Sequence, residues 1–197
     1  MEGLSLWAHP WWVNLLLLAP LVNYAVWRRR PLGLGGAQLA WSAGFAAGFG
    51  FVEAAVVVYL RAAIGMLPGY QGTLADVARL SSQAYQQARS IESFPQSLLT
   101  VEVAREAATL VMLLAVAMLA ARAPRDRWAA FLWMFAIWDV TYYAGLWATV
   151  RWPQSLLTVD VLFLIPVPWI SQVWFPVLVS ALCMAAVLAG RRRHSKA

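Results

Sequence analysis

Long apolar stretches alternate with short polar segments along this chain, and the pattern predicts a set of membrane-spanning helices. A helix needs roughly 20 apolar residues to cross a bilayer. Five stretches approach or exceed that length, at 10–27, 37–60, 101–121, 128–150 and 162–189. We therefore expect an all-α fold: a polytopic transmembrane helical bundle of about five spans, forming a single integral membrane domain over residues 1–197.

The last stretch is too long and too rich in proline for one straight span. From Thr158 to Gly190 a continuous helix would measure about 48 Å, whereas the bilayer core is about 30 Å thick. Pro166, Pro168 and Pro176 interrupt the stretch, and proline in a helix interior kinks or breaks it. We expect a proline-broken last helix, or a short interfacial or re-entrant segment through Pro168 followed by a span.

Composition agrees with a membrane protein and sets its expected orientation. The chain is 62% hydrophobic and only 12% charged, and charged residues make up about a quarter of a typical soluble domain. Arginines cluster after the first, third and fifth stretches, so the positive-inside rule places the N-terminus outside and the C-terminus inside. We expect a bacterial cytoplasmic membrane, with a first span and inner Arg loop at 10–34 and a basic cytoplasmic tail at 191–197.

Several classes of function are disfavoured by what the sequence lacks. Its net charge of +6 follows from the arginine clusters at the ends of the spans, and no aromatic-basic pattern outside the spans suggests nucleic-acid binding. Cys183 is the sole cysteine, which excludes an internal disulfide framework. His9 and His194 lie near the two ends of the chain, so a haem held by two histidines within the spans is not expected.

A nonapeptide occurs twice in the chain. Residues 95–103 recur as 153–161 with a single exchange, Glu102 against Asp160, and an aromatic residue precedes each copy. Eight identities in nine positions indicate a duplicated unit. The duplication predicts an acidic residue at the head of an apolar helix on two occasions, with Ser97, Thr100, Ser155 and Thr158 as candidate N-caps.

The duplication extends into the helices before the nonapeptide. One constant offset without a gap aligns Glu53 with Asp139 and also aligns the neighbouring phenylalanines at 45 and 49 with those at 131 and 135. We therefore expect two parallel repeat units, 37–122 and 128–190, with a site at their interface. Apolar helices resemble one another by composition, so chance remains an alternative for this part of the alignment.

The long connection at 66–99 is expected on the outer side. Within it, Leu74, Val77, Leu80 and Ala84 recur at helical spacing among polar residues. This pattern predicts an amphipathic helix that lies on the outer surface or packs on the bundle.

Acidic residues in the spans mark the candidate site. Five of the nine acids lie within or at the edges of apolar stretches, where an unpaired charge costs several kcal/mol, so these side chains should face the bundle interior. One helix face carries residues spaced i, i+3, i+4 and i+7: Glu102, Arg105, Glu106 and Thr109. The full expected cluster is Glu53, Glu102, Arg105, Glu106, Asp139, Tyr142, Tyr143 and Asp160.

Small residues accompany this cluster on the helix that bears Glu53. Gly44, Gly48 and Gly50 would allow a neighbouring helix to approach closely.

Three functions are compatible with such a cluster. The first is a carrier-like protein that handles a cation, a proton or a small polar substrate, with Arg105 as the counter-charge. The second is an accessory or assembly subunit of a larger membrane complex, whose salt bridges join helices. The third is a metal-dependent membrane enzyme with Glu53, Glu102, Glu106, Asp139 and Asp160 as ligands of a divalent cation such as Mg²⁺, Ca²⁺ or Mn²⁺.

No nucleophile or base accompanies these acids in a recognisable pattern, so no catalytic residue is identified and whether the chain is an enzyme stays open. No cofactor is predicted apart from that divalent cation. The expected partners are the lipid bilayer and a membrane protein or a second copy of this chain, and no nucleic acid.

Overall fold

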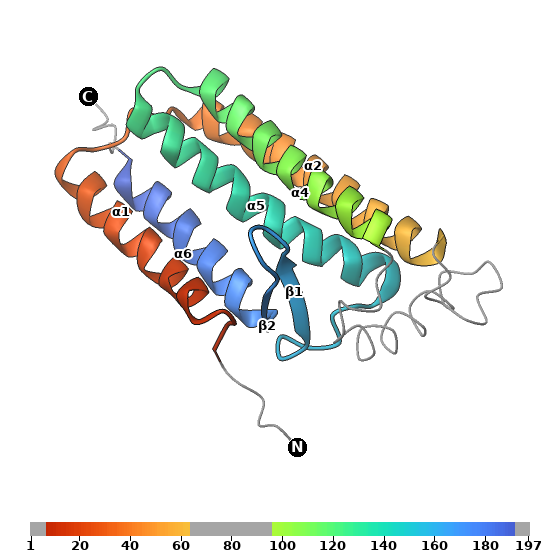
Figure 1. Ribbon diagram of the computed structural model, residues 1–197. Helices are drawn as coiled ribbons and strands as arrows, with labels where there is room; N and C mark the ends of the chain where they lie inside the picture. The colour runs from red at the N-terminus through yellow and green to blue at the C-terminus, as the bar shows by residue number, and fades with distance from the viewer. Residues whose placement is uncertain (1–6, 64–95, 192–197) are drawn as a thin grey trace.

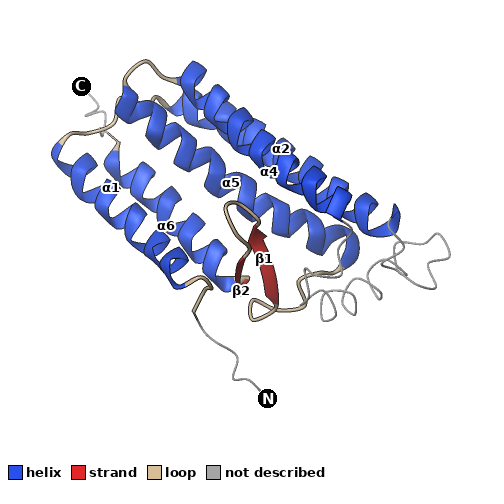
Figure 2. Ribbon diagram, in the orientation of Figure 1, coloured by secondary structure: helices blue, strands red, loops and turns tan. Residues whose placement is uncertain are grey.

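The structure is a computed structural model that describes residues 7–63 and 96–191 (Figure 1). The predicted amphipathic helix at Leu74 to Ala84 and residues 192–197 of the basic tail lie outside the described residues. The described part consists of helices and one two-stranded hairpin (Figure 2). In chain order the elements are η1 (Trp11–Leu17), α1 (Leu18–Arg29), α2 (Gly36–Ala63), α4 (Gln96–Ala120), α5 (Pro124–Val150), β1 (Val159–Phe163), β2 (Trp169–Gln172) and α6 (Trp174–Gly190).

Helices suited to a membrane dominate this architecture. Three stretches in the described residues are long and apolar enough to cross a bilayer: Gly36–Tyr59, Leu99–Ala120 and Pro124–Val150. Large apolar side chains project outward from them, with Trp41 82% and Leu119 87% exposed. Exposed apolar side chains in this number are characteristic of contact with lipid or with another protein. The predicted membrane helical bundle is confirmed at this level, whereas the number of five spans stays a prediction.

Helix α5 lies at the centre of the bundle and packs against three other helices. It contacts α2, α4 and α6, while α1 packs on the outer side of α6 (Figure 1). Two glycines allow α2 and α5 to approach closely. A Cβ atom built on Gly50 would lie 2.6 Å from the carbonyl oxygen of Trp138, and one on Gly145 would lie 2.9 Å from the Cβ of Ala54. Interdigitation through small residues is a common way for membrane helices to pack.

The segment before α6 differs from the all-α prediction. Strands β1 and β2 pair antiparallel, with Val159 opposite Gln172 and Val161 opposite Ile170. The prolines account for this difference, because Pro166 and Pro168 lie in the connection between the strands and proline biases the residue before it toward extended backbone. The expectation of a broken helix through this region is wrong, and a short segment followed by a helix agrees with the structure.

Helix α6 itself is not interrupted by proline. It begins at Trp174, so Pro176 falls in the first turn, where the backbone N–H groups have no partner within the helix. The predicted apolar stretch 162–189 therefore contains a helix only over its second part.

The two copies of the nonapeptide have different conformations. Residues 96–103 of the first copy form the beginning of α4, whereas the second copy forms a turn that leads into β1. The prediction that Asp160 stands at the head of a helix is therefore wrong. The residues that follow explain the difference: Ala104 to Ala108 favour helix after the first copy, and Pro166 ends any helical continuation after the second.

Serine and threonine in the second copy stabilise the turn instead of capping a helix. The Ser155 backbone N–H donates to Thr158 Oγ1 at 3.1 Å, and the Leu157 N–H donates to Ser155 Oγ at 3.2 Å. These local hydrogen bonds offer the backbone an alternative to the helix. The prediction of Ser155 and Thr158 as N-caps is therefore wrong.

The N-terminal segment extends the hairpin by one backbone pairing. His9 and Ile170 exchange two backbone hydrogen bonds, with N–O distances of 2.8 and 2.7 Å. Nearby, Trp12 of η1 contacts Trp169 of β2 edge to face, with ring centroids 5.2 Å apart. The hairpin is thus flanked by the chain start on one side and by the bundle on the other.

Candidate functional site

A cavity of about 90 Å³ lies where α2, α4, α5, α6 and the hairpin meet. We call it the polar cavity, because charged and hydroxyl-bearing side chains make up part of its wall. Its polar residues are Glu53, Arg105, Glu106, Thr109, Asp139, Tyr142, Tyr143, Asp160 and Ser180. Seven of the eight predicted site residues are in this set. Glu102, the eighth, does not line the cavity and reaches it through Arg105.

Arg105 joins α4 to α2 at one side of the cavity. Its guanidinium donates to Glu53 of α2 and, through Nη2 at 2.8 Å, to Glu102 one turn earlier on α4. Thr109 Oγ1 donates to the other oxygen of Glu53. Glu53 is only 4% exposed, and a buried carboxylate is tolerated when it is paired and hydrogen-bonded in this way.

Glu106 joins α4 to the hairpin. Its carboxylate accepts a hydrogen bond from the backbone N–H of Leu164, at 2.8 Å. Leu164 follows β1 directly. An acid on a helix face thus supplies the acceptor that this backbone donor needs in an apolar setting.

Two aspartates join α5 to the elements that follow it. Asp139 of α5 accepts a hydrogen bond from Ser180 Oγ of α6 at 2.8 Å, and Asp160 of β1 accepts one from Tyr143 Oη of α5 at 2.8 Å. Both aspartates are buried, at 8% and 3% exposure. Both aspartate side chains therefore lie in the interior of the described bundle.

Each carboxylate in the cavity wall therefore both bonds to another element and faces the cavity. It forms a hydrogen bond or ion pair to a second element, as a structural staple would, and it also lines a space shared with the other three. The wall contains four carboxyl groups and one guanidinium. Carboxyl groups thus outnumber cationic groups in a setting of low polarity, where any charge has to be balanced by protons or by a cation.

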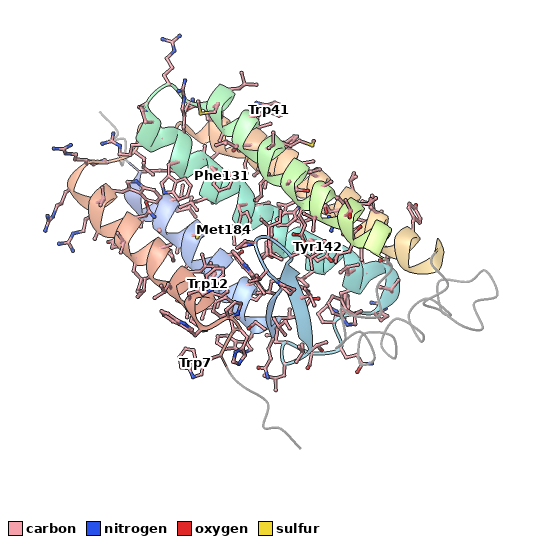
Figure 3. All side chains as sticks on the ribbon, in the orientation of Figure 1. Trp7, Trp12, Trp41, Phe131, Tyr142 and Met184 are labelled. Carbon is pink, nitrogen blue, oxygen red and sulfur yellow. The ribbon has the colours of Figure 1, made fainter. Side chains whose placement is uncertain are left out.

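Aromatic rings complete the wall on the side of α5 and the hairpin. Trp138 has its ring centroid 5.4 Å from that of Phe135, 6.2 Å from that of Tyr142 and 6.5 Å from that of Phe163. Phe163 continues the contact to Trp169 at 5.5 Å. All five rings line the polar cavity, and Tyr142 lies near the hairpin in Figure 3. We call these residues the aromatic wall.

Some of the site could not be predicted from the sequence pattern. Phe163 and Trp169 enter through the hairpin, which was expected to be helical or re-entrant. Ser180 was missed, although a serine within the apolar stretch of α6 is a detectable signal.

The described residues do not support a metal centre built from the five acids. Nowhere in 7–63 and 96–191 do three histidine, cysteine, aspartate or glutamate side chains come together in a way that would hold a metal ion. The carboxylates are distributed around the cavity and bonded to different partners.

Comparisons of the chain with protein-family models, with curated proteins and with solved structures find no match.

Proposed function

We propose that this chain is a carrier-like multi-pass membrane protein that binds a cation, a proton or a small polar substrate in the polar cavity. The observation that supports the proposal is the excess of carboxyl groups around one cavity: Glu53, Glu106, Asp139 and Asp160 against Arg105. Ionisable groups inside a membrane segment are costly and commonly mark an ion or substrate path.

The cavity distinguishes this proposal from a purely structural role. Protein interiors are packed about as densely as organic crystals, and voids larger than a water molecule are few. Ion pairs that only join helices need no such void. A space of about 90 Å³ with a partly polar lining is large enough for water or a small ligand.

The proposed orientation has the N-terminus outside and the C-terminus inside a bacterial cytoplasmic membrane. Helices η1 and α1 together measure about 32 Å and α6 about 26 Å, which is close to the thickness of the bilayer core. Added to α2, α4 and α5, they make five passes. The arginine-bearing ends of α1 and α6 lie together in Figure 1, and the hairpin lies toward the opposite end. The polar cavity is then in the outer half of the membrane.

A double substitution at Asp139 and Asp160 tests the proposal. Asp139→Asn with Asp160→Asn removes two charges, and the amide oxygen of asparagine can still accept the hydrogen bonds from Ser180 and Tyr143. We expect binding of NH₄⁺, Na⁺ or K⁺ to the protein in lipid nanodiscs, measured by titration calorimetry, to weaken about tenfold or more. Proton uptake is followed with a pH indicator in the same samples.

Asp126→Asn is the matched control, because it makes the same change on α5 but in the first turn of that helix, away from the cavity. The control should bind like the unmodified protein. Equal cation binding and proton uptake in the double variant and the unmodified protein would reject the proposal.

A second candidate, an accessory or assembly subunit of a larger membrane complex, is supported by the fact that the carboxylates already have partners in other elements. Purification in mild detergent separates the two ideas. A stoichiometric membrane protein that copurifies favours the subunit, and a lone monomer or homodimer counts against it.

A further inference from the structure

The aromatic wall gives the polar cavity two surfaces of different chemistry. Asp139, Asp160 and Glu106 supply carboxyl groups, and the rings of Trp138 and Tyr142 line the same wall. The face of an indole or phenol attracts a cation, and the attraction grows when the cation has lost its water shell. An organic ammonium ion can contact such a wall and donate N–H hydrogen bonds to the carboxylates, whereas a metal ion needs several oxygen ligands around one point.

The carboxylates are also arranged for an organic cation. A metal ion needs several oxygen atoms at 2.0–2.6 Å around one point, and the described residues present no such group. The cavity acids instead point to separate partners on α4, α5, α6 and the hairpin. A carboxylate offers about four acceptor sites, so each can accept a further N–H from a ligand.

Two indole N–H groups call for an acceptor. Trp138 is only 7% exposed, and among the described residues its Nε1 has no hydrogen-bond partner. Nε1 of Trp169 is likewise buried and has no hydrogen-bond partner among the described residues. Both residues line the polar cavity. A buried donor without an acceptor costs about 1–3 kcal/mol. An oxygen atom on a ligand would meet this need.

The volume limits the size of that ligand. The cavity volume is about 90 Å³, and about 10–15 Å³ of such volume is enough to hold one water molecule. A molecule of roughly three to five non-hydrogen atoms fits this space.

We propose that the ligand of the polar cavity is a small organic ammonium ion that also carries a hydroxyl or carbonyl oxygen, an amino alcohol being the simplest case. The inference rests on the proposed function and names the class of ligand for the same site. The ammonium group bonds to the aspartates and Glu106 beside the aromatic wall, and the oxygen atom accepts from Trp138.

Three compounds of equal size test this inference: ethanolamine, propylamine and ethylene glycol. Propylamine lacks the oxygen atom, and ethylene glycol lacks the charge. We expect ethanolamine to bind about tenfold more tightly than either one in titration calorimetry. The protein is held in nanodiscs of phosphatidylglycerol, which carries no amine. Ethylene glycol binding as tightly as ethanolamine, or ethanolamine no better than propylamine, would overturn the inference.

A variant isolates the role of the indole N–H. Trp138→Phe keeps an aromatic face and removes the donor, so the preference for ethanolamine over propylamine should fall toward one. An unchanged preference would remove Trp138 from the site and overturn that part of the inference. If Na⁺ or K⁺ binds in an Asp139-dependent and Asp160-dependent way while ethanolamine does not, this inference fails and the proposed function stands. If no cation or proton binds at all, both fail.

The amino alcohol group that binds in the cavity can come from a free amino alcohol or from the headgroup of phosphatidylethanolamine. Nanodiscs that contain phosphatidylethanolamine distinguish them. A headgroup that occupies the cavity lowers the apparent affinity for added ethanolamine, and a site for the free compound leaves the affinity unchanged. Both results support an amino alcohol ligand.

Discussion

At the scale of single residues, the close approach of α2 to α5 depends on which position holds a glycine. Of the three α2 glycines singled out in the sequence, Gly50 is pressed against the α5 backbone, while Gly44 and Gly48 have nothing within 4 Å of an added Cβ. The composition of the helix predicts close packing without saying which glycine makes the contact. The face that meets α5 is fixed by tertiary packing.

Replacing Gly50 should therefore be costly. We expect Gly50→Ala to lower the free energy of unfolding by about 1–3 kcal/mol, because the new methyl group collides with the Trp138 carbonyl oxygen and with Thr141. The measurement is reversible unfolding in a denaturing detergent, followed by circular dichroism.

Gly48→Ala on the same helix is the control and should change stability by no more than about 1 kcal/mol. Equal losses in the two variants would show that the contact with α5 does not limit stability at Gly50.

The polar residues of the cavity show how much of the site the sequence could predict. Glu53 and Asp139 had to face inward, since exposure to lipid is costly wherever the partner lies. Their actual partners, Arg105 with Thr109 and Ser180, depend on which helices become neighbours. The burial of an acid can be predicted from its place in an apolar stretch. Its hydrogen-bond partner can be identified only from the arrangement of all the helices.

At the scale of elements, the duplicated nonapeptide shows that local sequence does not determine local structure. Nearly the same residues form the start of α4 and the turn into β1. The residues that follow each copy account for the difference. A run of helix-forming residues continues the first copy as a helix, whereas the prolines at 166 and 168 disfavour a helix after the second copy and favour extended backbone. The repeat was visible in the sequence, but its two outcomes depend on sequence outside it.

Cysteine pairs can test the hairpin register. In a Cys183→Ala background, we expect Val161→Cys with Ile170→Cys to form a disulfide on mild oxidation, because these residues are opposite each other and cross-strand Cβ atoms lie about 4.5–5.5 Å apart. Protection from thiol alkylation after oxidation measures the bond.

Val161→Cys with Ser171→Cys is the comparison pair. A shift of one residue places the two side chains on opposite faces of the hairpin, so this pair should stay reduced. Formation of both disulfides, or of neither, would contradict the register.

At the scale of the whole molecule, composition was sufficient for the class of protein and insufficient for its details. A long apolar stretch inside a membrane has to satisfy its backbone hydrogen bonds internally, and a helix does so within one segment. A helical bundle therefore follows directly from the sequence. The hairpin and the site could not be predicted in the same way, because they depend on contacts between segments such as His9 with Ile170. The proposed number of passes follows from the apolar stretches and the helix lengths, and the proposed orientation follows from the arginine clusters.

Accessibility to an impermeant reagent tests that orientation. In the Cys183→Ala background, we expect a membrane-impermeant maleimide to label Trp7→Cys in intact cells and Arg122→Cys only after permeabilisation, since both positions are exposed at opposite ends of the bundle. Labelling of Arg122→Cys in intact cells, or failure to label Trp7→Cys there, would contradict the proposed orientation.

The long distance in sequence between bonded residues has a consequence during biosynthesis. Glu53 and Arg105 are separated by 52 positions, so at typical elongation rates roughly 3 to 10 s pass between the synthesis of the acid and that of its counter-ion. Asp139 similarly precedes Ser180 by 41 positions. Helix α2 therefore emerges from the ribosome before its own ion pair can exist, and its surrounding phenylalanine, valine and alanine side chains have to support insertion of the lone acid until α4 arrives.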